Sequence, residues 1–295
     1  MTIAALVAIG IRSSIVLTMV GLGLTARRGD ATSLFRDPAR LTLALIVMMV
    51  IVPILAVIAA HTFELEPAVT IAIVALSVSP VPPLWVNKTR QLEGGESYTI
   101  GLLVASSVLA IPLIPIELAI AEGIFSIPLS MPLTKVAELT LGLSLLPLAL
   151  GIGLARVRPR VANRLAVPVS RAGLVLLVVC AVPLLVKFWS DLTSLVGDGT
   201  MLAMAAFSAV GLLAGHVLGG PADEDRAVLA LAAASRHPGI AIALATTNFP
   251  DQKLVPAAVV LYLLVSAVVC FSYSRWHRHH MHRERPQRAP LAVIR

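Results

Sequence analysis

Charged and aromatic residues are scarce in this chain of 295 residues. Asp, Glu, Lys and Arg together make up 13% of it and the aromatic residues 4%, whereas soluble domains carry about 25% charged residues. Hydrophobic residues reach 58%, and the mean hydropathy is +0.91. This composition excludes an ordinary soluble domain and predicts an all-α polytopic membrane protein.

Cysteine is nearly absent. Cys180 and Cys270 each lie in an apolar stretch, without the spacing of a disulfide framework or a metal site, and we expect both to serve in packing. The sequence shows no phosphate-binding loop and no nucleophile–base–acid set, so we expect neither an enzyme nor a bound cofactor. The net charge of +7 is carried by short loops and the C-terminal tail, a pattern that reports membrane orientation and not nucleic-acid binding.

Long apolar segments predict nine membrane spans, because roughly 20 apolar residues cross the hydrocarbon layer. The predicted spans are 4–25, 41–60, 67–86, 99–121, 133–155, 167–188, 200–218, 227–247 and 254–273. Arginine and lysine concentrate in alternate loops, which predicts an inner-membrane protein with its N-terminus outside and its C-terminus in the cytoplasm. We expect one transporter domain over 1–295, with a basic cytoplasmic tail over 276–295.

The eighth span holds the most informative stretch, Ser235-Arg236-His237-Pro238-Gly239. Pro238 ends a helix, and broken backbone is tolerated in a membrane only inside protein or beside a cavity. A charged residue at this depth is costly, so Arg236 marks a candidate substrate site. Its other interpretation is a structural arginine that bonds backbone carbonyls. His237 is either a proton relay or substrate donor, or a packed histidine.

The third span is also interrupted, by Pro80, Pro82 and Pro83. Corresponding broken helices in two halves of a chain are the best sequence pointer to the site of a secondary transporter. The spacing of the two breaks predicts inverted repeats, over about 1–122 and 132–275. Trp85 and Asn87 follow the first break, and we expect both to contribute to the substrate site.

Other polar residues lie within or near spans. Arg12 is a second candidate for the cavity, and Glu117 also falls inside a span. Lys135 and Glu138 stand three residues apart on one helix face and are expected to pair. The pair of glycines in Gly21-x-Gly23 is expected to allow close helix packing.

At these residues the chain resembles the bile acid:sodium symporter family, whose members move bile acids and other organic anions. The similar segments carry small residues, prolines and the two breaks: 17–25, 34–38, Pro53, 79–87, 92–96, Ser107, Pro112 and 226–245. The resemblance implies a core of spans two, three, four, seven, eight and nine, and a panel of spans one, five and six. It further implies substrate binding between core and panel by alternating access, where the broken helices cross. From the same resemblance we expect that the family's usual first helix is missing here, which would explain nine spans.

The resemblance also assigns sodium-ligand positions, and this chain departs from the family at nearly all of them. They are occupied by Met48, Val86, Asn87, Ile100, Val104, Ala232 and Arg236. Sodium prefers several oxygen ligands, as hard cations do, and of these side chains only that of Asn87 supplies one. We therefore expect no sodium site of the usual kind, with Arg236 as a tethered cation in its place.

The leading interpretation is thus a secondary transporter of small organic anions that works without sodium. The alternative is a membrane sensor or assembly protein, built on a transporter fold, that no longer transports. The sequence leaves open the substrate, the coupling ion and the oligomeric state.

Overall fold

The computed structural model describes residues 3–82, 96–197 and 199–284. Within these ranges the chain is helical and has no strand. The helices longer than seven residues are α1 (Ile3–Thr25), α2 (Pro38–Leu45), α3 (Val52–Thr62), α4 (Pro67–Ser77), α6 (Glu96–Phe125), α7 (Leu133–Thr140), α8 (Leu146–Val157), α9 (Pro159–Lys187), α11 (Thr200–Leu218), α12 (Asp223–Ala234), α13 (Pro238–Asn248) and α14 (Val255–Glu284). Shorter elements are the turns η1 (Asp30–Thr32) and η2 (Leu34–Arg36), the π-helical segments η3 (Ile46–Ile51) and η5 (Leu141–Leu145), and α10 (Trp189–Ser194).

Eight helical segments among the described residues are long and apolar enough to cross a membrane. They confirm eight of the nine predicted spans and the all-α polytopic fold. The remaining one, predicted over 67–86, begins with α4, a helix of 11 residues that ends at Ser77. Residues 83–86 lie outside the described ranges, so the full length of this span stays a prediction.

Two helices extend beyond the spans predicted for them. Helix α9 begins at Pro159 and not at 167, because Pro159 occupies the favoured first helical position and the polar residues after it continue the helix. Helix α14 continues to Glu284, so the first residues of the predicted basic tail belong to the last helix. In both cases the helix is longer than its apolar segment. A high hydropathy identifies the apolar part of a helix and not its ends.

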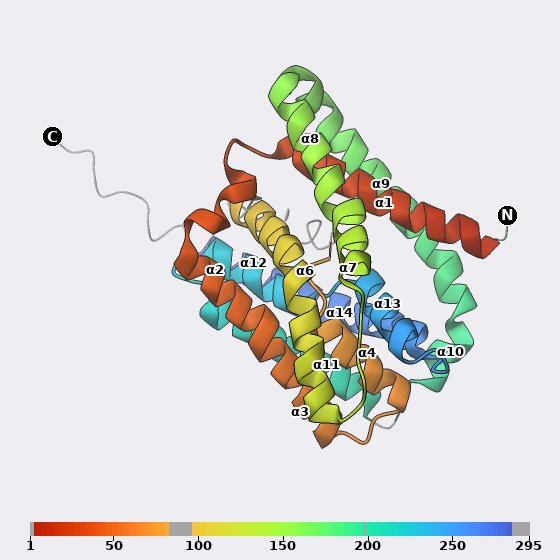
Figure 1. Ribbon diagram of the computed structural model, residues 1–295. Helices are drawn as coiled ribbons and strands as arrows, with labels where there is room; N and C mark the ends of the chain where they lie inside the picture. The colour runs from red at the N-terminus through yellow and green to blue at the C-terminus, as the bar shows by residue number, and fades with distance from the viewer. Residues whose placement is uncertain (1–2, 83–95, 198, 285–295) are drawn as a thin grey trace.

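Helix α1 packs against α8 and α9 (Figure 1). Glycines bring the backbones together: a Cβ on Gly23 would collide with the Leu148 carbonyl and the backbone of Gly151. A Cβ on Gly21 would likewise collide with Ser170 of α9. The predicted role of the Gly21-x-Gly23 pair in close packing is confirmed, and this group contains the helices expected to form the panel.

The second group of helices surrounds the two broken segments. Residues 227–237, from α12 into the second break, are all buried. Helix α12 packs against α11, α14 and α6, and α13 packs against α4 and α14. The residues of the second break therefore occupy the centre of the protein, shielded from lipid by other helices.

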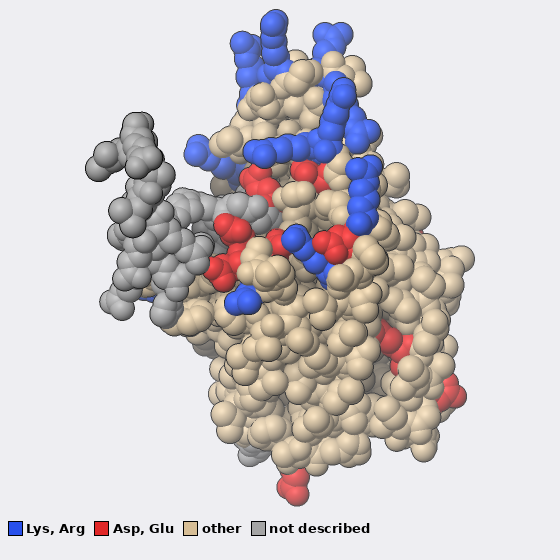
Figure 2. Space-filling model, turned by 90° about the vertical axis from the view of Figure 1, so that its left-hand side faces the viewer, with Lys and Arg blue, Asp and Glu red and all other residues tan. Residues whose placement is uncertain are grey.

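The outer surface is apolar over most of its area. Figure 2 shows Lys and Arg side chains gathered towards one end, above a broad face with few charges. Large side chains such as Leu150, Val157 and Val186 are at least 70% exposed. Such a surface suits a lipid environment, as the eight apolar helices require.

Candidate functional site

The second break separates α12 from α13. Helix α12 ends at Ala234, Ser235 and His237 adopt extended backbone, and Pro238 opens α13. The Nδ1 atom of His237 accepts a hydrogen bond of 3.3 Å from the backbone N–H of Ile240 and so caps α13. The predicted position of this break is confirmed, and the capping bond assigns His237 a structural role.

The first break follows α4 and lies directly against the second. Ser79 and Pro80 leave the helix, since Pro80 has no N–H with which to continue it. The backbone N–H of His237 donates to the carbonyl of Pro80 and to the hydroxyl of Ser79, each at 3.0 Å. Two segments 158 positions apart in the sequence are thus hydrogen-bonded to one another. The expected meeting of the two breaks is confirmed.

Arg236 joins this junction to a third helix. Its side chain is fully buried. Nη1 donates to the carbonyl of Ser79 at 3.0 Å, and Nη2 donates to the carbonyl of Met48 at 2.9 Å. Nε has no hydrogen-bond partner among the described residues. The guanidinium therefore links both breaks to the segment between α2 and α3, and its Nε atom stays without a partner among the described residues.

The carbonyl of Met48 is available because the helix around it is π-helical. In η3 the N–H of Val52 bonds to the carbonyl of Val47 and not to that of Met48. The next residue, Pro53, has no N–H to offer. The Met48 carbonyl therefore receives no hydrogen bond from residue 52 or residue 53. The Arg236 guanidinium donates to it instead. π-Helical turns of this kind occur frequently at functional sites.

Two helices have their C-terminal ends close to Arg236, either through its hydrogen bonds or along the chain. Ser79 follows the C-terminus of α4, while Ala234 ends α12 and accepts a bond of 2.8 Å from the Tyr262 hydroxyl. The C-terminal ends of helices carry partial negative charge. A buried guanidinium at this junction compensates that charge, which matches one of the roles expected for Arg236.

The other predicted site residues are distributed unevenly. Trp85, Val86 and Asn87 lie outside the described residues. Arg12 is exposed on α1, and in the described part of the chain no hydrogen bond or ion pair links it to Arg236. The Nε2 atom of His237 has no partner within the described ranges. Of the predicted site residues, Arg236, His237 and Pro238 therefore lie at the junction of the two breaks, and the substrate-binding role of the whole set stays a prediction.

The remaining sodium-ligand positions carry apolar side chains in the structure. Met48, Ile100 and Ala232 are buried, and Val104 is half-buried. None of these four side chains contains an oxygen. Arg236, at a fifth position, donates a hydrogen bond to the backbone carbonyl of Met48, which is one of these four.

Sequence reasoning did not find two contributors to the site. The Met48 carbonyl acts through the backbone, and the signal for it was Pro53 a few residues downstream. Glu117 on α6 is buried, and neither carboxyl oxygen has a hydrogen-bond partner among the described residues. A carboxylate at this position would interact electrostatically with the Arg236 guanidinium. The sequence signal that could have identified Glu117 was its position as a single acidic residue inside an apolar span.

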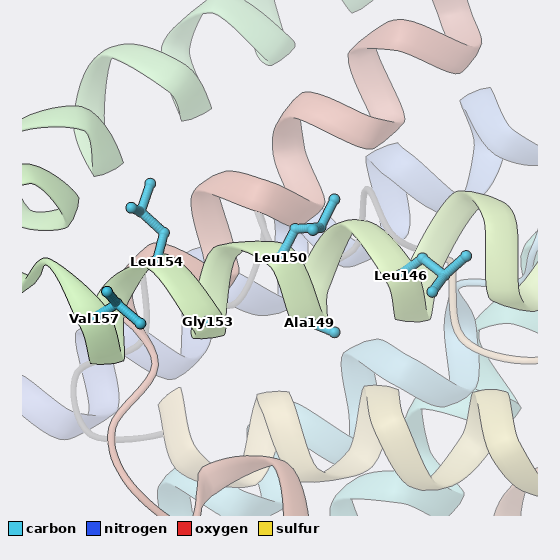
Figure 3. Close-up of a pocket in the computed structure, with 6 residues that line it drawn as sticks. All are labelled: Leu146, Ala149, Leu150, Gly153, Leu154 and Val157. Carbon is cyan, nitrogen blue, oxygen red and sulfur yellow. The ribbon is translucent and has the colours of Figure 1, made fainter.

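A surface groove on α8 is a weaker candidate (Figure 3). Leu146, Ala149, Leu150, Gly153, Leu154 and Val157 line it. All six belong to one helix and none has a polar side chain, so the groove offers nothing that would recognise an anion. Lipid chains suit such a surface.

Comparison with known proteins agrees with the sequence resemblance. The sequence model of the sodium bile acid symporter family matches residues 14–197, more than half of the chain. The matched part includes α4 and the first break and ends before α11. No curated protein matches the chain. The chain nevertheless belongs, by the extent of the family match, to the sodium bile acid symporter family.

Proposed function

We propose that the protein is a secondary transporter of small organic anions that works without sodium, with Arg236 as its fixed cation. Membership of the family supports transport of this type. The observation that supports transport without sodium is the position of the Arg236 guanidinium. It donates to Ser79 beside the first break and to Met48 in η3, from its own place in the second break.

The described side chains at the expected sodium positions do not supply the ligands of a sodium ion. A sodium site needs several oxygen ligands, but the side chains at Met48, Ile100, Val104 and Ala232 supply none. The carbonyl oxygens of Ser79 and Met48 are instead occupied by N–H donors of Arg236. A permanent positive charge at the same place would also repel a second cation. A covalently attached cation here removes the need for a soluble one.

An anionic substrate would gain from two features of the junction. The N-terminus of α13 begins at Pro238, and helix N-termini carry partial positive charge that favours anions. Arg236 adds a full charge and an unused Nε donor. Both are buried, so we propose that substrate reaches them when the α1–α8–α9 group moves relative to the other helices, as in alternating access between core and panel.

The proposed orientation follows the distribution of positive charge. Loops rich in arginine lie on the cytoplasmic side under the positive-inside rule, which puts the N-terminus outside and the C-terminus inside an inner membrane. The grouping of Lys and Arg at one end of Figure 2 supports this orientation.

Uptake into proteoliposomes tests the proposal. Taurocholate is a suitable probe, because its sulfonate stays ionised and does not cross lipid unaided. We expect equal uptake in sodium and in choline buffers, and loss of uptake in Arg236→Gln. Arg171→Gln is the matched control, since Arg171 is exposed on α9. A strict sodium requirement would contradict the proposal, and absence of flux for every organic anion tried would favour a transport-inactive sensor.

A further inference from the structure

Glu117 is a buried ionisable group that the proposed function leaves unused. It lies on α6, two residues after Pro115, and is 9% exposed. Both of its carboxyl oxygens are buried and lack a hydrogen-bond partner among the described residues. Ionisable residues inside membrane spans mark substrate pathways and proton relays.

We infer that Glu117 is the proton-binding group of this transporter and that it exchanges with the substrate anion as the counter-charge of Arg236. This inference rests on the proposed transport function and adds the coupling ion to it. One proton would be transported together with the substrate for each negative charge that the substrate carries.

Arg236 is the charged group that acts on Glu117. Its guanidinium interacts electrostatically with the Glu117 carboxyl. The other charged residues on elements packed against α6 lie near helix ends; they are Asp30, Arg36, Arg40, Lys135, Glu138 and the residues at the start of α12. Most of these have partners of their own, as in the pairs Lys135–Glu138 and Arg40–Asp225. His61 of α3 stacks on Phe125 at the end of α6.

The surroundings of Glu117 require a proton in this conformation. A carboxylate without water or a donor is far more costly to bury than a neutral acid. With the proton bound, the charge of Arg236 is balanced only by carbonyl dipoles and is available to an anion. When the proton leaves, the carboxylate becomes the counter-charge of Arg236 and competes with the substrate.

The two states of the cycle have the same net charge. In the loaded state the protein holds neutral Glu117, positive Arg236 and one negative charge of the substrate. In the empty state that returns across the membrane, Glu117 has lost its proton and is the negative counter-charge of positive Arg236; the substrate-free conformation described here precedes that loss, holds the proton and awaits the anion. The loaded and the returning state are each neutral at the junction, so neither moves an unbalanced charge through the membrane, which is the costly alternative. The proton leaves to water on the side where the anion is released.

Proteoliposomes with a trapped pH dye test the coupling. In sodium-free buffer with an acidic exterior, we expect wild type to take up taurocholate and to acidify the lumen with it. Glu117→Gln should lose the response to the pH gradient while keeping the rise in melting temperature that taurocholate causes. Glu122→Gln is the matched control, because Glu122 is exposed on the same helix. Coupled uptake that persists in Glu117→Gln, or wild-type uptake that ignores the gradient, would overturn the inference.

A second measurement works without any substrate. Infrared difference spectra of wild type minus Glu117→Gln at neutral pH should contain the carbonyl band of a protonated carboxylic acid, and spectra of wild type minus Glu122→Gln should not. If wild type moves no taurocholate, the transport proposal fails for this anion, and the infrared band still decides whether Glu117 holds a proton. Absence of the band overturns the inference in either case.

Discussion

The Arg236 guanidinium donates a hydrogen bond of 2.9 Å to the backbone carbonyl of Met48, 188 positions earlier in the chain. This contact joins the second break to a helix of the other half of the sequence. The same side chain bonds Ser79 beside the first break. One residue therefore holds together the three segments on which the proposed site depends.

Replacement of Arg236 should reduce stability as well as flux. Arg236→Gln leaves at least one of the carbonyls of Ser79 and Met48 without a donor, and we expect a loss of about 2–5 kcal/mol. Arg236→Lys keeps the charge but cannot reproduce the planar fork that reaches two acceptors, so we expect a smaller loss. Unfolding of the detergent-solubilised protein measures both. Equal stability of Arg236→Gln and wild type would show that the two bonds are unimportant.

His237 has a capping role that substitution can separate from any role in transport. Asparagine is a good N-cap, because its side-chain oxygen accepts from the first turn, whereas alanine is poor. His237→Ala should therefore cost about 1 kcal/mol of stability, and His237→Asn much less. Thermal unfolding checks this order. If His237→Asn is stable but inactive in uptake, the imidazole takes part in transport; full activity would restrict His237 to capping.

The position of both breaks could be predicted from the sequence, because proline has local effects. Pro80 and Pro238 lack an N–H wherever they stand, so a helix must end near them. The prediction of a site at these breaks required a further expectation, namely that the broken segments of the two halves meet in space. The hydrogen bonds from the His237 N–H to Pro80 and Ser79 confirm that they meet.

The partners of Arg236 could not be predicted in the same way. Its acceptor on Met48 exists only because η3 is π-helical, and that geometry depends on how the helix relaxes before Pro53. The sequence suggested a structural arginine bonded to carbonyls or a functional cation, and the geometry is compatible with both. The full lengths of α9 and α14 could not be predicted from hydropathy either, because both helices continue into more polar sequence.

The ion pair between Arg40 and Asp225 should contribute more than the surface pair Lys135–Glu138. Both are short, at 2.8 and 3.0 Å, but the Asp225 side chain is 11% exposed and that of Glu138 is 69% exposed. Surface pairs contribute about 0–1 kcal/mol, so Glu138→Gln should have almost no effect. Asp225→Asn should destabilise the protein more, because it leaves Arg40 with Asp37 alone. Unfolding of the two variants side by side checks the order, and equal effects would contradict it.

The contact of α1 with α8 offers a test of packing that is separate from the site. Gly23→Ala places a methyl group against the Leu148 carbonyl and the Gly151 backbone. Backbone cannot rotate aside as a side chain does, so we expect a loss of about 1–3 kcal/mol, the usual cost of overpacking. Gly153→Ala on α8 is the matched control, because nothing lies within 4 Å of the added carbon. That change should stabilise the helix by up to about 1 kcal/mol, the difference in helix propensity between alanine and glycine. If both substitutions shift the melting temperature in the same direction, α1 and α8 do not pack through their glycines as described.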